Sequence, residues 1–131
     1  RRQRQMCIRD RADEDSKIGD AFTIAEFVMG VNETTEADLP ETVLAWDLVR
    51  AVNMARWAFI CGYINEDEMW EAIRTTAGIA KESFNSWEEY GNSFAVGRGI
   101  WRGETDDYET ADEVVGALLN KEDSPWKAIE W

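Results

Sequence analysis

SWEEYGNSFAVGRGIW, residues 86–101, is the stretch around which the rest of the chain is organised. Ser86 and Glu89 have the spacing of a capping box, in which each side chain accepts a hydrogen bond from the backbone N–H of the other residue. The acids of the first turn fall at the positive end of the helix dipole, and Arg98 falls near its negative end. The stretch therefore predicts a helix that begins at Trp87.

One broad face of this helix is apolar. At about 100° per residue, that face consists of Trp87, Tyr90, Gly91, Phe94, Ala95, Arg98 and Trp101. A glycine inside a helix costs about 0.8–1 kcal/mol relative to alanine. Gly91, Gly97 and Gly99 therefore predict close approach by another helix, or a break at Gly97 and Gly99. Arg98 lies within the apolar face, where a guanidinium needs a carboxylate partner or an aromatic ring to stack on.

Helical periodicity continues on both sides of this stretch. The other helices that we expect cover residues 17–30, 41–61, 66–82 and about 111–119, the last with Thr110 as its N-cap. Asn65 and Glu68 form a second capping signature. The segment 41–61 is the longest and is apolar on more than one side, so it is predicted to be the central helix. Acidic loops are expected over residues 32–39 and 103–109.

The C-terminal segment contains Pro125, which blocks continuation of a helix, and two tryptophans. We expect these tryptophans to hold an extended tail against the rest of the protein. The predicted fold class is all-α, an irregular bundle of about five helices with this tryptophan-clamped tail. The residues to which we assign structural roles are Trp46, Ser86, Trp87, Glu89, Tyr90, Gly91, Trp101, Trp126 and Trp131.

Residues 1–11 resemble sequencing-adaptor read-through. Met6 to Arg11 is what the codons ATG TGT ATA AGA GAC AG, completed by one more base, would encode, and this resembles the end of a transposon adaptor used in library preparation. We therefore expect residues 1–11 to be disordered and residues 12–131 to form a single helical domain. The authentic N-terminus is expected to be missing.

The chain is strongly acidic, since 27 Asp and Glu against 14 Lys and Arg give a formal net charge of −13. Without residues 1–11 the net charge becomes −17, because five arginines and one aspartate are removed. Such a surface repels the phosphates of nucleic acids, so we expect no nucleic-acid partner. Two interpretations remain: the charge serves solubility or reflects a salty habitat, or an acidic face binds a basic protein partner.

No apolar run approaches the roughly 18 residues that span a bilayer, so no membrane partner is predicted. With Cys7 set aside, Cys61 is the only cysteine, which favours a reducing compartment. We predict a cytoplasmic location, although a signal peptide in a missing N-terminal segment would not be visible. Cys61 is expected to be a buried small hydrophobe rather than a reactive thiol.

The chain contains no histidine. This removes histidine general bases, Ser-His-Asp and Cys-His pairs, and most zinc sites. The acidic clusters at residues 106–109 and 122–123 lack the ligand order of an EF-hand loop and are interpreted as solvated loops. We therefore assign no catalytic residue, no metal ligand and no cofactor.

The candidate ligand-binding residues are Asp47, Arg50, Asn53 and Arg98. Asp47 and Arg50 are three residues apart, as are Arg50 and Asn53, so neighbours in this series can touch on a helix. One interpretation is a partly buried network, together with Arg56, that fixes helix register against Arg98. The alternative is a pocket in which Arg50 or Arg98 binds an anionic ligand and Asp47 orients it.

Five landmarks occur in order along residues 41–131. They are Ala45–Arg50 (AWDLVR), Gly62-Tyr63-Ile64 followed by acids and Trp70, Ser86–Gly91 (SWEEYG), Gly97-Arg98 before Trp101, and Ser124-Pro125-Trp126 with a final Trp131. Together they resemble the bacterial family catalogued as domain of unknown function 1266. The resemblance implies a mostly helical bacterial domain without an assigned activity, catalytic residue or cofactor. It also implies an N-terminal part that this chain lacks.

The charge and the missing catalytic set favour a non-enzymatic interaction module with an acidic surface, of which an immunity or toxin-neutralising role is one form. The alternative is a small anionic-ligand binder, or an enzyme that works through carboxylates and arginines around Asp47, Arg50 and Arg98. A third hypothesis is a domain that supports a larger protein preceding residue 12. A pocket that holds both Asp47 and Arg98 would favour the hypothesis of a small-ligand site.

Overall fold

The computed structural model describes residues 17–131 and contains helices and no strand over that range. Its helices are α2 (Lys17–Asn32), the 3₁₀ turn η1 (Glu36–Asp38), α3 (Leu44–Ile60), α4 (Glu66–Ser83), α5 (Trp87–Arg102), α6 (Thr105–Asn120) and α7 (Pro125–Ala128). The predicted all-α fold class is confirmed. The predictions for residues 1–11, and for the start of the domain at residue 12, fall on residues outside the described range.

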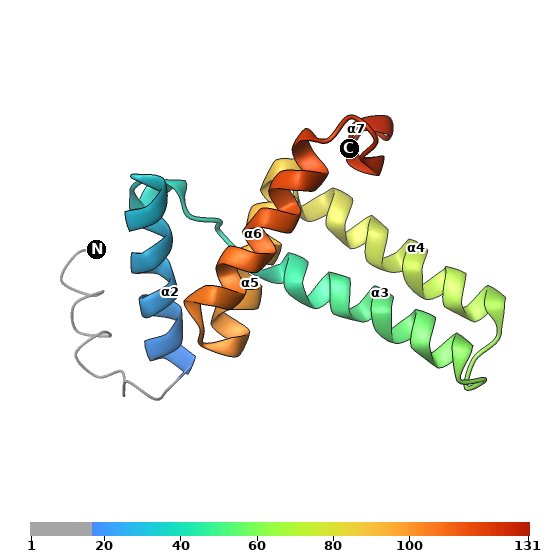
Figure 1. Ribbon diagram of the computed structural model, residues 1–131. Coiled ribbons are helices and arrows are strands. Elements are labelled where there is room, and N and C mark those ends of the chain that lie inside the picture. Colours follow the sequence, from blue (N-terminus) through green and yellow to red (C-terminus); the bar gives the residue numbers. More distant parts are fainter. Residues whose placement is uncertain (1–16) are drawn as a thin grey trace.

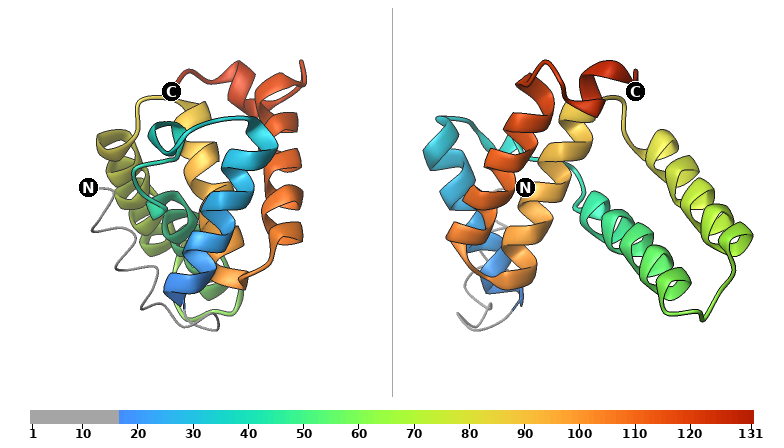
Figure 2. Two further views of the ribbon diagram at one scale, coloured as in Figure 1. Left: turned by 90° about the vertical axis from the view of Figure 1, so that its left-hand side faces the viewer. Right: turned by 45° about the vertical axis from the view of Figure 1, so that its right-hand side comes forward.

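The helices form two regions. Helices α2, α5 and α6 lie side by side and make a compact body, whereas α3 and α4 form a hairpin that projects away from it (Figure 1). We call residues 44–83 the arm. The right-hand view of Figure 2 shows the same separation, with the C-terminal α7 lying near the base of the arm.

The body is built around α5, not around the segment 41–61 that was predicted to be central. Helix α5 packs against α2, α3 and α6. The residues that it buries are Gly91, Ser93, Ala95, Val96, Gly97 and Gly99, and nearly all of them are small. Since they lie around much of the helix circumference, neighbouring helices approach α5 from several sides. The physical reason for the correction is size, because a helix with small side chains can be surrounded more closely than one with Trp46 and Trp57.

The close approach predicted from the glycines is confirmed. A Cβ atom added at Gly97 would lie 2.5 Å from Trp46 Cβ, and one added at Gly91 would lie 2.5 Å from Val115 Cγ1. The alternative of a helix break at Gly97 or Gly99 is wrong, because α5 continues to Arg102. The helix ends at Gly103, whose φ of 74° is left-handed.

The cap of α5 is only half of a capping box. Ser86 Oγ accepts from the Glu89 backbone N–H at 3.1 Å, as predicted. The Glu89 carboxylate, however, accepts from the backbone and side-chain N–H groups of Asn85 instead of from Ser86. The full box predicted at Asn65 and Glu68 is present, with bonds of 2.9 and 2.8 Å.

Two predicted boundaries are wrong because tertiary contacts decide them. Helix α3 begins at Leu44, where the buried Ser93 hydroxyl donates to Thr42 O and accepts from the Ala45 N–H. Helix α6 begins at Thr105, so most of the predicted acidic loop is helical. Its Tyr108 is only 4% exposed and packs edge-on against Phe27, and burying this ring requires the first turns of α6 to lie on the body.

The tail is clamped by aromatic rings, as predicted, but it is not fully extended. Pro125 occupies the first turn of the short helix α7, a position where its missing N–H costs nothing. The Trp87 ring stacks on Trp126 at 4.8 Å and meets Trp131 edge-on at 4.9 Å. The Trp131 indole also donates to Phe84 O at 2.8 Å. The tail therefore joins the start of α5 to the end of α4.

Candidate functional site

A cleft lies between the first turn of α3 and helices α5 and α6. It has a volume of about 380 Å³ and is lined by Trp46, Phe94, Arg98, Asp106, Asp107, Thr110, Ala111 and Val114. Half of these side chains are apolar and half are polar or charged, and the volume falls within the range of small-molecule sites. This cleft is the candidate functional site.

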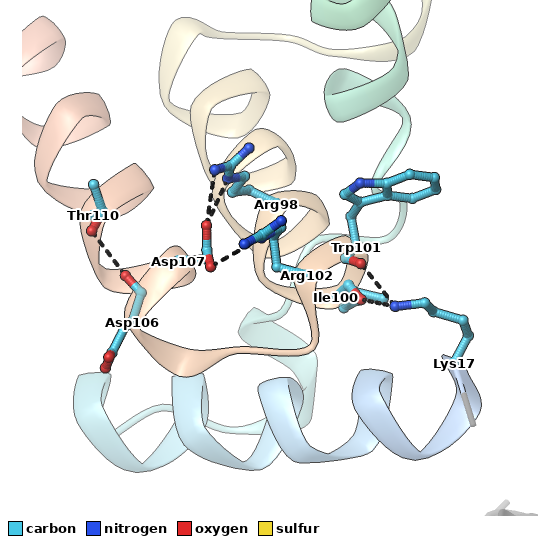
Figure 3. Close-up of polar contacts among 8 residues, drawn as sticks. All are labelled: Lys17, Arg98, Ile100, Trp101, Arg102, Asp106, Asp107 and Thr110. Carbon is cyan, nitrogen blue, oxygen red and sulfur yellow. Dashed lines mark hydrogen bonds and ion pairs between the residues drawn. The ribbon is translucent and has the colours of Figure 1, made fainter. Parts of the chain in front are cut away.

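Asp107 is the charged centre of the cleft. It contacts Arg98, a predicted site residue, and Arg102, which was not predicted to belong to the site (Figure 3). Arg98 Nε donates to Asp107 Oδ1 at 3.0 Å, and its Nη2 lies 2.9 Å from the same oxygen. Arg102 Nε contacts the other oxygen at 3.4 Å. Arg98 therefore has the carboxylate partner that its place on α5 requires. Because both Asp107 oxygens are occupied, this carboxylate is poorly placed to act as a base.

Arg98 and Arg50 also stack on indole rings. The Arg98 guanidinium lies 5.3 Å from the Trp46 ring centroid. The Arg50 guanidinium lies 4.4 Å from the Trp101 ring and 5.8 Å from that of Trp46. These cation–π contacts attach the side of α3 to the end of α5. Trp101, to which the sequence analysis assigns a structural role, is half-exposed, and its ring lies against the Arg50 guanidinium.

The structure does not bring the four predicted ligand-binding residues into one pocket. Arg98 lines the cleft, whereas Asp47, Arg50 and Asn53 do not. Asp47 is exposed and has no side-chain hydrogen bond or ion pair among residues 17–131. Arg50 lies on the exposed side of α3, and Asn53 is partly buried. A network that joins Asp47 to Arg98 is thus absent from the described residues.

One polar group of the cleft lacks a partner. The Trp46 Nε1 atom is buried and makes no hydrogen bond, the only such side-chain atom among residues 17–131. Its ring is held between Phe94, at a centroid distance of 5.5 Å, and the two arginines. The Trp46 ring therefore joins α3 to α5 through Phe94 and Arg98.

Acidic side chains cover the side of α6 that faces away from the body. At 100° per residue, Asp106, Glu109 and Glu113 lie opposite the buried Tyr108 and Val115. All three are exposed, and none has a basic partner among residues 17–131. We call Asp106, Glu109, Thr110, Glu113 and Val114 the outer face of α6.

Asp112 lies on α6 beside the outer face. Burial raises the pKa of the Asp112 carboxyl above its ordinary value, and the neighbouring Glu113 charge raises the pKa further. Burial likewise raises the pKa of the Tyr108 hydroxyl, with Asp112 adding to the rise and a hydrogen bond from Asn32 opposing it. Burial is therefore the main cause that disfavours the charged form of Asp112, and the like charge of Glu113 adds to it.

A second, more apolar groove of about 410 Å³ lies between the arm and the tail. Its lining includes Val52, Ile73, Ala77, Tyr90, Ile129 and Trp131. Trp87 and Trp131 pack against each other and also line this groove.

Two further sequence predictions can be compared with the structure. Cys61 follows the last turn of α3 and is exposed, so the expectation of a buried side chain is wrong. The arm ends there without a third element to cover the thiol. No group of acidic or cysteine side chains in residues 17–131 is arranged to hold a metal ion.

The model of the family described as Protein of unknown function (DUF1266) matches residues 1–131. The chain belongs to this family. No curated protein and no solved structure matches this DUF1266 chain. None of its helices within residues 17–131 is both long and apolar enough to cross a membrane.

The cleft residues that the sequence analysis missed are those of α6. Asp106, Asp107 and Thr110 were assigned to a loop or to a cap, although acids in a first turn are typical of a helix N-terminus. Thr110 was taken as an N-cap, whereas its hydroxyl donates to the carbonyl of Asp106 inside the helix. The signal was present but ambiguous, because acids are equally common in loops.

Proposed function

We propose that this DUF1266 domain is a non-enzymatic protein-interaction module whose acidic outer face of α6 binds a basic protein partner. The observation that carries the proposal is the row formed by Asp106, Glu109 and Glu113, which are exposed and lack basic neighbours in residues 17–131. Spacings of three and four residues place these like charges side by side, where they repel each other. Lysine or arginine from a partner would remove this repulsion and form charge-assisted hydrogen bonds.

The cleft beside this face supports the proposal. Val114 is 53% exposed, and with Phe94 and Ala111 it provides apolar surface next to the carboxylates. A basic side chain has an aliphatic stem as well as a charged head, so it matches such a mixed surface. An immunity-type role, with a basic toxin as the partner, is one form of this function. The cytoplasmic location belongs to the same proposal.

The alternative of an anionic-ligand site, or of a carboxylate and arginine enzyme, has less support from the geometry. Its two main residues, Arg98 and Asp47, do not share the cleft, and the Arg98 guanidinium is paired with Asp107. An added anion would have to compete with that carboxylate, with Asp106 close by. We therefore favour the acidic outer face of α6 over the Arg98 cleft as the functional surface.

The experiment is a pull-down from bacterial lysate with the full chain, at low and at moderate salt, with mass-spectrometric readout. The test variant carries D106K, E109K and E113K on α6. A matched control carries D67K, E71K and E82K on α4, which changes the net charge equally and also includes one first-turn acid. Each variant is first checked for an unchanged helical circular-dichroism spectrum.

We expect a basic protein to be captured at low salt, to be weakened by added salt, and to be lost with the α6 variant but kept with the α4 variant. Equal loss in both variants would show that only net charge matters and would contradict a specific face. Capture of nothing by the unchanged chain would also contradict the proposal and would make ligand screening at Arg98 the next step.

A further inference from the structure

The apolar groove between the arm and the tail has no part in the proposed function. Its volume of about 410 Å³ falls within the range of small-molecule sites. The arm contributes Val52 and Ile73 to its lining, and the first turn of α5 and the tail contribute Trp87, Tyr90 and Trp131. The groove is therefore apolar and rich in aromatic rings.

The tryptophan side chains of the groove are held in place by hydrogen bonds to backbone carbonyls. Trp87 Nε1 donates to Ile129 O at 2.7 Å, and Trp131 Nε1 donates to Phe84 O at 2.8 Å. The Trp131 ring also meets Trp87 edge-on at 4.9 Å and lies 5.5 Å from the Tyr90 ring. Because these contacts already fix the rings, a ligand that packs against them costs little further side-chain freedom.

Two polar side chains that line the groove have no polar partner among residues 17–131. The Lys81 ammonium lies 5.1 Å from the centroid of the Trp131 ring and forms no ion pair in that part of the chain. The Tyr90 hydroxyl forms no hydrogen bond there, and burial raises its pKa, so it stays protonated and able to donate. An ammonium and a hydroxyl donor beside an apolar groove match a ligand with one carboxylate and an apolar body.

The charges on the lining favour an anion over a cation. Aromatic rings also attract cations to their faces, but Lys81 already lies over the ring of Trp131. Lys81 is the only basic residue on the lining among residues 17–131. Glu130 also lines the groove, is exposed and forms no ion pair with Lys81. An anion would therefore gain an unpaired ammonium, while the Glu130 charge would oppose it.

We propose that this groove binds a small amphipathic carboxylate, such as a medium-chain fatty acid. Its carboxylate would pair with Lys81, and its apolar body would lie against Trp87, Tyr90 and Trp131. The formal net charge of −13 disfavours unspecific binding of anions, so saturable binding of one would indicate a built site. The groove shares no residue with the outer face of α6 or with the cleft at Arg98, so it can be tested independently of both.

The test is isothermal titration calorimetry of the full chain with octanoate, and with octan-1-ol as a neutral compound of the same chain length. Octanoate should saturate one site per chain and bind up to about fivefold more tightly than octan-1-ol, the factor that an exposed ion pair contributes. Lys81→Met keeps an apolar side chain and should remove this difference. The matched control Lys121→Met, at an exposed position outside the groove, should preserve it.

A steric change provides the second readout. Ala77 lines the groove and is exposed on α4, so Ala77→Trp should fill the groove and abolish the binding of both compounds. Ala72→Trp, at an exposed position on α4 outside the lining, should leave binding unchanged. Glu130→Gln should strengthen the binding of octanoate but not that of octan-1-ol. Circular-dichroism melting shows whether each variant is folded.

Absence of saturable octanoate binding overturns the inference, as does binding that survives Ala77→Trp. Equal affinities for the two compounds, or an equal loss of octanoate affinity with Lys81→Met and Lys121→Met, would refute the carboxylate contact at Lys81. If neither compound binds but Ala77→Trp loses a protein that the unchanged chain captures from lysate, a protein segment occupies the groove instead. None of these results decides the role of the outer face of α6, which the triple lysine variant tests separately.

Discussion

The body and the arm use the same secondary structure but differ in how many sides of each helix are covered. Helix α5 in the body is surrounded by α2, α3 and α6, and the core around it includes Ile24 and Val115. In the arm, α3 and α4 cover each other along one side, only the first turns of α3 also meet α5, and Trp57 and Ile60 remain exposed. A two-helix hairpin has one internal interface, so apolar residues on its other sides stay in water until a partner covers them.

The largest expected contrast between the two regions comes from truncating an isoleucine in each. Ile24 is fully buried in the body, so Ile24→Ala should lower the free energy of unfolding by about 2–5 kcal/mol. Ile60→Ala, at a 73% exposed position of the arm, should change it by less than about 0.5 kcal/mol. Urea denaturation monitored by circular dichroism measures both. A loss at Ile60 as large as that at Ile24 would break the distinction between body and arm.

The glycines provide a second contrast, because replacing one by alanine should lower the free energy of unfolding in the body and raise it in the arm. An added Cβ at Gly91 would meet Val115 at 2.5 Å, so Gly91→Ala should destabilise the body by about 1–3 kcal/mol. An added Cβ at Gly78, in α4 of the arm, would meet nothing within 4 Å. Gly78→Ala should therefore raise the free energy of unfolding by about 0.5–1 kcal/mol, because alanine has the higher helix propensity. Melting temperatures that move in the same direction for both would contradict the packing described for α5.

A smaller effect is expected at the ion pair that closes the cleft. Arg98 and Asp107 keep 39% and 20% side-chain exposure, so solvent screens their attraction. A double-mutant cycle of Arg98→Ala and Asp107→Asn should give a coupling free energy of about 1 kcal/mol. A coupling several times larger would show a sealed network, and a coupling near zero would leave only the stacking on Trp46.

The smallest effect concerns the pH dependence of stability at Asp112. Because its folded-state pKa is raised above the ordinary value of 3.8, the stability linked to its protonation is fully present below that value. This stability is lost as the pH rises through the folded-state pKa. Asp112→Asn should therefore raise the melting temperature slightly at neutral pH and leave it unchanged in acid. A lower melting temperature at neutral pH would instead show that the Asp112 charge is favourable.

The candidate site could be predicted only in part. Arg98 was identified as a guanidinium that needs a carboxylate partner or a ring to stack on, since that requirement follows from its place on an apolar helix face, and the structure provides both. Its actual partners, Asp107 and Trp46, lie on two other helices. Sequence spacing paired Asp47 with Arg50, because residues three apart are neighbours on one helix. The spacing of residues along the chain does not show which side chains meet between helices.

The sequence by itself determined the all-α class, the N-caps at Asn65 and Ser86, the close approach at Gly91, and the tryptophan clamp of the tail. Each follows from short-range stereochemistry or from the size of a side chain. Only the tertiary structure decided that α5 is central, that α6 begins at Thr105, and that the arm leaves Trp57 and Ile60 exposed. These depend on which helices meet, and the free energy of that choice is summed over contacts between residues far apart in the chain.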